Sequence, residues 1–238
     1  MFIPLYDANP LRTIRAPFVT YGLLTFSTII FVVFQSGLML QAENASIAGF
    51  GVIPSEMLLP IALRDPLTIV PQPLTFVTYL FVHGNWMHLI GNMLFLWVFG
   101  DNVEDAMGHW RFLVFYLLCG IGAALAHVAM SASSDIPLVG ASGSIAGIVA
   151  AYVILHPRVK LWVLLLMRLP IRISALWAIG GWLLFQFANV LWSSDHATAW
   201  WAHIGGFATG ALLIIIFRRP GVPLFGRAGV AAETRALR

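Results

Sequence analysis

The sequence predicts an all-α, polytopic membrane protein with six transmembrane helices. Of its 238 residues, 60% are hydrophobic and only 10% are charged, whereas soluble domains carry roughly 25% charged residues. The mean hydropathy is +0.88. Several apolar stretches also reach the roughly 20 residues that a transmembrane helix needs. The bilayer is therefore the expected solvent of this chain.

Six stretches without Asp, Glu, Lys or Arg define the predicted spans. In chain order they cover residues 18–40, 74–100, 112–130, 138–155, 173–192 and 197–217. The second is longer than needed, so we expect its start after Pro73. Residues 1–17 form a polar leader, which favours a signal anchor over a cleaved signal peptide. The apolar run 161–167 is too short to span and is predicted to lie at the membrane interface.

The basic residues predict the orientation of the spans. With the N-terminus in the cytoplasm, twelve of the 13 Lys and Arg residues fall inside and only Arg64 falls outside. Cytoplasmic loops carry such an excess, so both termini are predicted to be cytoplasmic. Because these residues sit at helix ends, the net charge of +3 does not indicate nucleic-acid binding. The apolar external connection 41–73 is predicted to lie at the outer interface, and the tail 218–238 is predicted to be disordered.

Polar side chains within the spans are the functional candidates, because they are costly in a membrane. They are His83, Asn85, His88, Asn92, His127, Ser142, Ser144, Gln186, Asn189 and His203. The second, fourth and sixth spans all run from outside to inside. Ser142 lies about four residues into the fourth span and His203 about six into the sixth, which gives both a depth of roughly 6–9 Å at ~1.5 Å per residue.

Small residues predict that the fourth and sixth spans pack closely. One face of the fourth carries Gly143, Ala146, Gly147 and Ala150, and one face of the sixth carries His203, Gly206 and Gly210. Two such faces let helix backbones approach, which would bring Ser142 to His203. Packing alone is the alternative interpretation of these glycines.

His88 and Asn92 are spaced i, i+4, and so share one face of the second span. Together they could donate hydrogen bonds to a developing oxyanion, or they could act only as a polar clamp between helices. His83 is about 140° away around the helix. We expect it to have a different role, such as holding the external connection.

Several chemistries are excluded by the residues that the spans lack. The sequence has no HExxH motif, which argues against a zinc protease. No predicted span contains Asp or Glu, so an aspartyl mechanism and proton-coupled transport have no carboxylates to use. A Ser–His pair here would be a dyad without an acidic third member. No metal and no cofactor are predicted.

Four motifs, in this order and at these helix ends, resemble the rhomboid family of intramembrane serine proteases, in its minimal six-helix bacterial-type form. The resemblance covers nearly the whole chain. The motifs are His83-x4-His88-x3-Asn92, Gly100-x3-Glu104-x3-Gly108, Gly140-x-Ser142-Gly143 and Ala202-His203-x2-Gly206-x3-Gly210.

The resemblance implies a role for each matching residue. Ser142 would be the nucleophile and His203 the general base and later the acid. The Ser142 backbone N–H, His88 and Asn92 would form the oxyanion hole. Supporting roles fall to His83, Gly140, Gly143, Gly206, Gly210 and Glu104. The implied substrates are transmembrane segments of other membrane proteins, cut near the outer face. The implied location is the bacterial inner membrane, with lipid as partner and neither nucleic acid nor metal.

One departure and three alternatives accompany this resemblance. Some relatives carry an aromatic residue four positions after the nucleophile, where this chain has Ala146, so we expect Trp200 or Trp201 to orient His203. Ser144 is the alternative nucleophile, but it lies two residues deeper and lacks the following glycine. An inactive rhomboid-like binding or chaperone module is the alternative function, although such relatives would lack the serine or the histidine. A transporter would instead place polar residues at the midplane.

Overall fold

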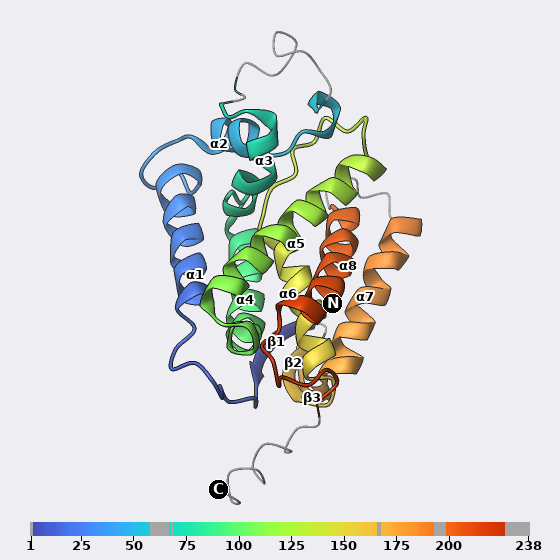
Figure 1. Ribbon diagram of the computed structural model, residues 1–238. Coiled ribbons are helices and arrows are strands. Elements are labelled where there is room, and N and C mark those ends of the chain that lie inside the picture. Colours follow the sequence, from blue (N-terminus) through green and yellow to red (C-terminus); the bar gives the residue numbers. More distant parts are fainter. Residues whose placement is uncertain (1, 58–66, 68, 166–167, 193–198, 227–238) are drawn as a thin grey trace, which may run out of the picture.

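The structure is a helical bundle with a small sheet at one end (Figure 1). It is a computed structural model, and it describes the chain except for residues 1, 58–66, 68, 166–167, 193–198 and 227–238. Within the described residues, four helical segments are long and apolar enough to cross a membrane: Phe18–Gln35, His109–Met130, Ala175–Trp192 and Trp200–Phe217. The chain is therefore a polytopic membrane protein. That the chain has six spans and that both termini are cytoplasmic remain predictions.

The first predicted span is helical over most of its length. α1 covers Phe18–Ile30 and continues into a π-helical turn, η1, at Phe31–Gln35. The helix ends short of residue 40 because Gly37 has a φ of +73°, a conformation that breaks a helix. The connection that follows holds α2, Glu43–Phe50, and a 3₁₀ turn, η2, at Pro54–Glu56.

The second predicted span is not one helix, which corrects the sequence interpretation. α3 covers Gln72–Thr78 and is followed by a 3₁₀ turn, η4, at Tyr79–Phe81, and α4 starts only at Trp86 and runs to Met107. Asn85 has extended backbone angles, and its side chain accepts a hydrogen bond from the His88 N–H at 2.9 Å. This N-cap starts a new helix, so His83 lies in the preceding turn and not on α4.

The remaining helices follow the predicted spans more closely. Gly108, with a φ of +86°, turns the chain into α5, His109–Met130. Next come α6, Ser142–Leu155, α7, Ala175–Trp192, and α8, Trp200–Phe217. In α6 every residue from 143 to 152 is buried. This short helix is thus the centre of the bundle, surrounded by α4, α5 and α8 (Figure 1).

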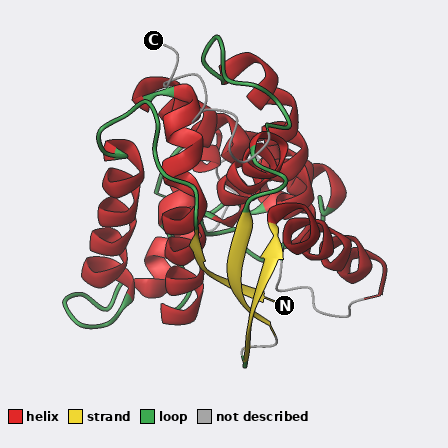
Figure 2. Cartoon of the chain, turned by 90° about the horizontal axis from the view of Figure 1, so that it is seen from below, coloured by secondary structure: helices red, strands yellow, loops and turns green. Residues whose placement is uncertain are grey.

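A three-stranded antiparallel sheet corrects the all-α prediction (Figure 2). Its order is β1 (Phe2–Asp7), β2 (Lys160–Leu165) and β3 (Leu169–Ser174). Lys160 and Trp162 of β2 are exposed, and Leu161 and Val163 are buried, which is the alternation of a half-buried strand. Residues 161–165 of the run predicted to be an interfacial segment therefore belong to a strand, and residues 166–167 lie outside the described residues. The strand forms because the distant leader and the next segment satisfy its backbone groups.

The leader folds against the same end of the bundle as the sheet. The Asp105 carboxylate of α4 accepts hydrogen bonds from three consecutive backbone N–H groups, those of residues 12–14, at 2.7–3.0 Å. The Tyr152 hydroxyl of α6 donates to Asp7 at 2.5 Å. The leader is thereby anchored to α4 and α6.

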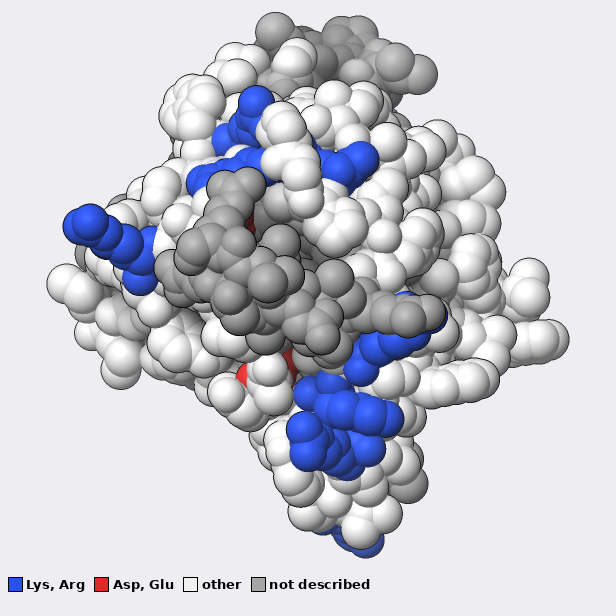
Figure 3. All heavy atoms as spheres, turned by 60° about the horizontal axis from the view of Figure 1, so that its bottom comes forward, with Lys and Arg blue, Asp and Glu red and all other residues white. Residues whose placement is uncertain are grey.

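The start of the predicted tail also folds back on the bundle. The Arg219 N–H donates to the Ala106 carbonyl at 2.8 Å, and the Gly226 N–H donates to the Leu155 carbonyl at 3.2 Å. Residues 227–238 of the tail lie outside the described residues. Figure 3 shows Lys and Arg side chains over this end of the molecule and few acidic atoms.

Candidate active site

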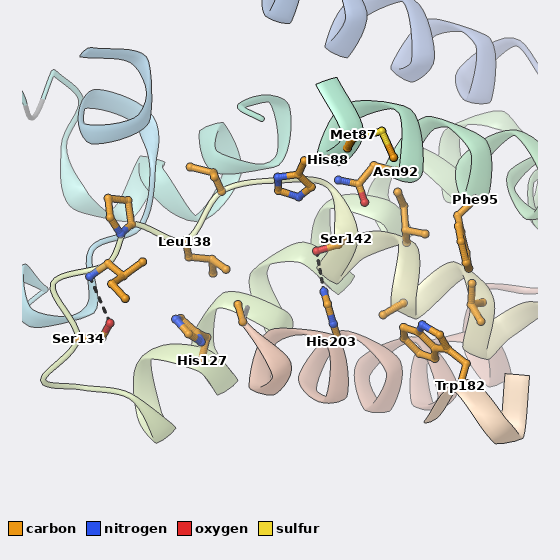
Figure 4. Close-up of a pocket in the computed structure, with 18 residues that line it drawn as sticks. Met87, His88, Asn92, Phe95, His127, Ser134, Leu138, Ser142, Trp182 and His203 are labelled. Atoms are coloured by element: carbon orange, nitrogen blue, oxygen red, sulfur yellow. Dashed lines mark hydrogen bonds between the residues drawn. The ribbon is translucent and has the colours of Figure 1, made fainter. Parts of the chain in front are cut away.

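Ser142 and His203 meet at the junction of α6 and α8. The Ser142 Oγ lies 2.9 Å from His203 Nε2, although the residues are 61 positions apart (Figure 4). At this distance the hydroxyl can donate to an unprotonated Nε2, which is the arrangement of a nucleophile and its general base. The predicted pairing is present in the structure.

Ser142 is the first residue of α6, so the prediction that it lies about four residues into the helix is wrong. The turn before it contains Gly140, with a φ of +108°, which delays the start of the helix. The first N–H groups of an α-helix have no partner within the helix and carry its positive dipole end. The position therefore supplies both the Ser142 hydroxyl and a backbone donor beside it.

Close contact between α6 and α8 brings the pair together. A Cβ at Gly206 would collide with the Gly143 carbonyl oxygen, and a Cβ at Gly210 would collide with the Gly147 backbone. Only glycine permits this separation. The predicted small-residue contact between the fourth and sixth spans is confirmed.

His203 is held from α7 as well as from its own helix. Its Nδ1 lies 3.1 Å from the Oε1 of Gln186, and its ring centroid lies 6.1 Å from that of Trp182. Trp200, one of the two expected neighbours, meets the ring edge-on at 6.2 Å. The sequence names Gln186 as a polar candidate, expected to form a hydrogen bond between helices, but the pairing with His203 and the contact of Trp182 were not predicted. The available signal was the i, i+4 spacing of Trp182 and Gln186, which places an aromatic and an amide on one helix face.

His88 and Asn92 of α4 lie on the other side of Ser142. A Cβ at Gly140 would lie 2.6 Å from His88 Cε1 and 3.4 Å from Asn92 Nδ2, so glycine is required there by space as well as by φ. Asn92 Nδ2 is buried and has no hydrogen-bond partner among the described residues. Leaving a buried amide without a partner is costly. Asn92 Nδ2 is therefore a donor that a bound ligand could satisfy.

His83 does not line the site. Its ring is fully buried and lies edge-to-face on His88 at a centroid distance of 5.2 Å. Its backbone N–H donates to the Gln35 Oε1 of η1 at 3.0 Å. His83 thus ties the end of the first helix to the turn before α4 and supports one face of the His88 ring.

Ser144 and Glu104 have other partners. The Ser144 hydroxyl donates to the Tyr116 carbonyl of α5 at 2.7 Å, so it does not compete for His203. The fully buried Glu104 accepts from the backbone N–H groups of Val19 and Thr20 at 3.0 and 2.8 Å. It thereby caps the start of α1.

The site opens into a cavity of about 410 Å³, whose lining is mostly apolar with a few convergent polar groups (Figure 4). Such a composition is typical of ligand sites. His127 of α5, one of the polar candidates from the sequence, also lines it. The lining residues are Met87, His88, Gly91, Asn92, Phe95, His127, Ser134, Ile136, Pro137, Leu138, Val139, Ser142, Ile145, Ala146, Val149, Trp182, Ala199 and His203.

The fold and the site together define a polytopic membrane protein with a Ser–His pair at the N-terminus of its central helix. Comparison with known families narrows the class. The family model described as the rhomboid domain matches residues 70–220, which is more than half of the chain. The chain belongs to the rhomboid family.

Individual relatives agree with this assignment. The chain is 33% identical over 160 residues to "Rhomboid protease AarA" of Providencia stuartii, a match that covers 57% of this chain and 53% of the relative. It is 39% identical over 79 residues to "Rhomboid-like protein 11, chloroplastic" of Arabidopsis thaliana, covering 33% and 28%. It is 30% identical over 146 residues to "Presenilin-associated rhomboid-like protein A, mitochondrial" of Danio rerio, covering 56% and 35%. The matches span about half or less of these relatives.

Proposed function

We propose that this protein is an intramembrane serine endopeptidase that cleaves transmembrane segments of other membrane proteins near their outer ends. The observation that carries the proposal is the 2.9 Å contact between Ser142 Oγ and His203 Nε2 at the wall of the cavity. Membership of a family that includes a relative named a protease supports it.

The pair supports a two-step acyl transfer. In the first step Ser142 Oγ bonds to the scissile carbonyl carbon while His203 Nε2 takes its proton and returns it to the leaving amine. In the second, water attacks the resulting ester, His203 removes the water proton, and Ser142 leaves with that proton. The cavity supplies the space for the substrate carbonyl and for water.

Three donors surround the place where the oxyanion would form. The Ser142 backbone N–H lies at the start of α6, and Asn92 Nδ2 and the His88 ring lie across Gly140 from it. Preorganised donors of this kind are worth roughly 10²–10³ in kcat each. His88 acts as a donor when one of its ring nitrogens is protonated.

The substrate class follows from the surroundings of the site. The cavity lies among helices of membrane-spanning length and apolarity, so a segment that reaches it through lipid is itself apolar. A transmembrane helix has its carbonyl groups bonded internally. A substrate must therefore unwind locally, and residues with low helix propensity near the cleaved bond lower that cost.

The proposal includes six spans with both termini in the cytoplasm. α4 and α6 would be the two spans beyond the four of sufficient length and apolarity, and the distribution of twelve basic residues against one supports the orientation. The relatives named above come from a bacterium, a chloroplast and a mitochondrion. They do not support one compartment, so the bacterial inner membrane stays a prediction from the sequence.

A cleavage assay with matched serine variants tests the function. Detergent-purified wild type, Ser142→Ala and Ser144→Ala are incubated with a panel of single-span substrates. We expect product bands from wild type and Ser144→Ala and none from Ser142→Ala. If Ser142→Ala gives the same bands, or wild type gives none with any substrate, the protease proposal fails. Substrate capture without cleavage by the wild type would favour the binding-module alternative.

A further inference from the structure

We propose that Gln186 of α7 is the positioning residue of the site, which holds the His203 imidazole in the tautomer that the reaction needs. This inference rests on the proposed peptidase function, because it assigns the third group behind the Ser142–His203 pair. It was not part of the sequence prediction, which placed no orienting group on the fifth span.

The hydrogen-bond geometry assigns the protons. His203 Nε2 lies 2.9 Å from Ser142 Oγ, and Nδ1 lies 3.1 Å from Gln186 Oε1. An amide oxygen can only accept, so Nδ1 carries the proton. In a neutral imidazole Nε2 is then unprotonated and free to take the serine proton. Without an acceptor at Nδ1, the ring also populates the other tautomer, in which Nε2 cannot act as a base.

The burial of Gln186 is unusual for its helix. α7 is largely exposed, and its buried residues are Ala175, Ala178, Ile179 and Gln186. Gln186 is the single polar side chain among these four, at 3% exposure. A buried amide on an otherwise apolar membrane helix costs free energy unless a hydrogen bond compensates for its desolvation. In the described structure its partner is the imidazole of His203, the base of the proposed dyad.

Trp182 lies one turn before Gln186 and provides a second contact between α7 and the imidazole. Its ring is tilted by 39° to that of His203 at 6.1 Å, while Trp200 approaches from α8 at 85° and 6.2 Å. Ala146 of α6 offers no ring to this side chain. The aromatic contacts of the His203 ring in the described structure thus come from α7 and α8.

The positioning group proposed here is neutral, which distinguishes it from the carboxylate of a Ser–His–Asp triad. A carboxylate at this place would stabilise the imidazolium that forms when Ser142 is deprotonated, whereas an amide orients the ring without adding charge. The other titratable side chains that face the same cavity are His88 of α4 and His127 of α5. The hydrogen-bond partner of His203 Nδ1 is Gln186 and neither of these histidines.

The test compares Gln186→Leu, Gln186→Glu and the matched control Asn189→Leu. Asn189 is on the same helix, but its side chain bonds only the Phe185 carbonyl at 2.7 Å in the described structure. We expect Gln186→Leu to lower kcat by roughly 10- to 100-fold, a loss of the size seen when the hydrogen-bond partner that orients a metal-binding histidine is removed. KM should stay within about twofold, and Asn189→Leu should change both constants by less than about twofold.

Gln186→Glu separates positioning from simple helix packing. Glutamate keeps an oxygen acceptor at the same reach and adds charge, so it should retain activity and move the acid limb of the kcat/KM profile to higher pH. If Gln186→Glu is as inactive as Gln186→Leu with an unmoved acid limb, or if Gln186→Leu keeps the wild-type kcat, the inference is overturned.

A readout without catalysis keeps this inference distinct from the protease proposal. Imidazole ¹⁵N spectra of the Ser142→Ala protein, with the His203 signal assigned by its loss in His203→Gln, report the tautomer directly. We expect Nδ1–H in the presence of Gln186 and a mixture in the Gln186→Leu background. The same tautomer in both backgrounds contradicts the inference even if peptides are cleaved. Conversely, the expected shift would support it even if the cleavage assay failed.

Discussion

Gly206 of α8 lies directly against the Gly143 carbonyl oxygen of α6. A Cβ at position 206 would overlap that oxygen, so the two backbones are in contact one residue after Ser142 and one turn after His203. This contact sets the distance between the elements that carry the proposed nucleophile and base.

Gly206→Ala should therefore weaken both stability and cleavage. Overpacking at a tight contact typically lowers the free energy of unfolding by about 1–3 kcal/mol. The displacement of α8 would also lengthen the hydrogen bond between Ser142 and His203. Thermal unfolding in detergent and cleavage rates measure the two effects. Gly180→Ala on α7 is the control, because nothing lies within 4 Å of its added Cβ. An active, undestabilised Gly206→Ala protein would contradict the contact.

Gly140→Ala should abolish cleavage through both strain and collision. Its φ of +108° is unfavourable for alanine, and the added Cβ would meet His88. Gly37→Ala shares the positive φ of +73° but has open space around the Cβ. We expect each variant to lose about 1–3 kcal/mol of stability from strain and only Gly140→Ala to lose activity. Equal activities of the two variants would count against the proposed oxyanion hole.

Asn92→Leu should lower kcat with little change in KM. The variant removes a donor that has no partner in the described structure, so a loss of roughly 10²–10³ in kcat is expected for an oxyanion donor. Steady-state kinetics measure this, and labelling of Ser142 by a fluorophosphonate probe reports whether the dyad itself survives. A raised KM at constant kcat would indicate ground-state binding instead.

His156 should make the protein less stable as the pH falls. Burial, with a further contribution from Arg12, lowers the pKa of this side chain from 6.5 to about 4. The unfolded chain then binds more protons between these two values, so stability is lost as the pH drops from about 6.5 towards about 4. His156→Phe should flatten that part of the curve of unfolding free energy against pH, as measured by denaturant titration.

Asp7 provides the opposing control for that experiment. Burial raises the pKa of this carboxyl group, so its contribution favours the folded state as the pH falls towards 3.8. Asp7→Asn should therefore steepen the acid loss of stability where His156→Phe reduces it. Identical pH curves for the two variants would show that neither group titrates as the burial implies.

The predicted topology can be checked with single cysteines. Cys119 is the lone cysteine and is buried, so Cys119→Ala provides a silent background. In that background Ser133→Cys, between α5 and α6, should react with an impermeant maleimide in intact cells. Pro223→Cys, after α8, should react only after permeabilisation. The reverse result would invert the predicted orientation.

Sequence reasoning succeeded where the signal was local or periodic. The third, fifth and sixth spans follow from uninterrupted apolar runs, and the Ser142–His203 pairing followed from glycines at helical spacing on the fourth and sixth spans. It failed at the start of α4, where Gly84 and the Asn85 cap interrupt an apolar run that still reads as one helix. In the structure His83 accordingly lies before that helix, and Ser142 lies in the first turn of α6.

The amino-acid sequence alone was enough to identify a membrane protein, to locate most of its helices and to name the polar side chains of the Ser142–His203 site. Hydropathy and residue spacing suffice for that, because the cost of a charge in lipid and the pitch of a helix are properties of the segment alone. The pairing of residues 2–7 with 160–165 in a sheet and the contact of Gln186 with His203 emerged only from the folded structure. Such contacts join segments that are far apart in the chain, and their energies exist only once the backbones have met.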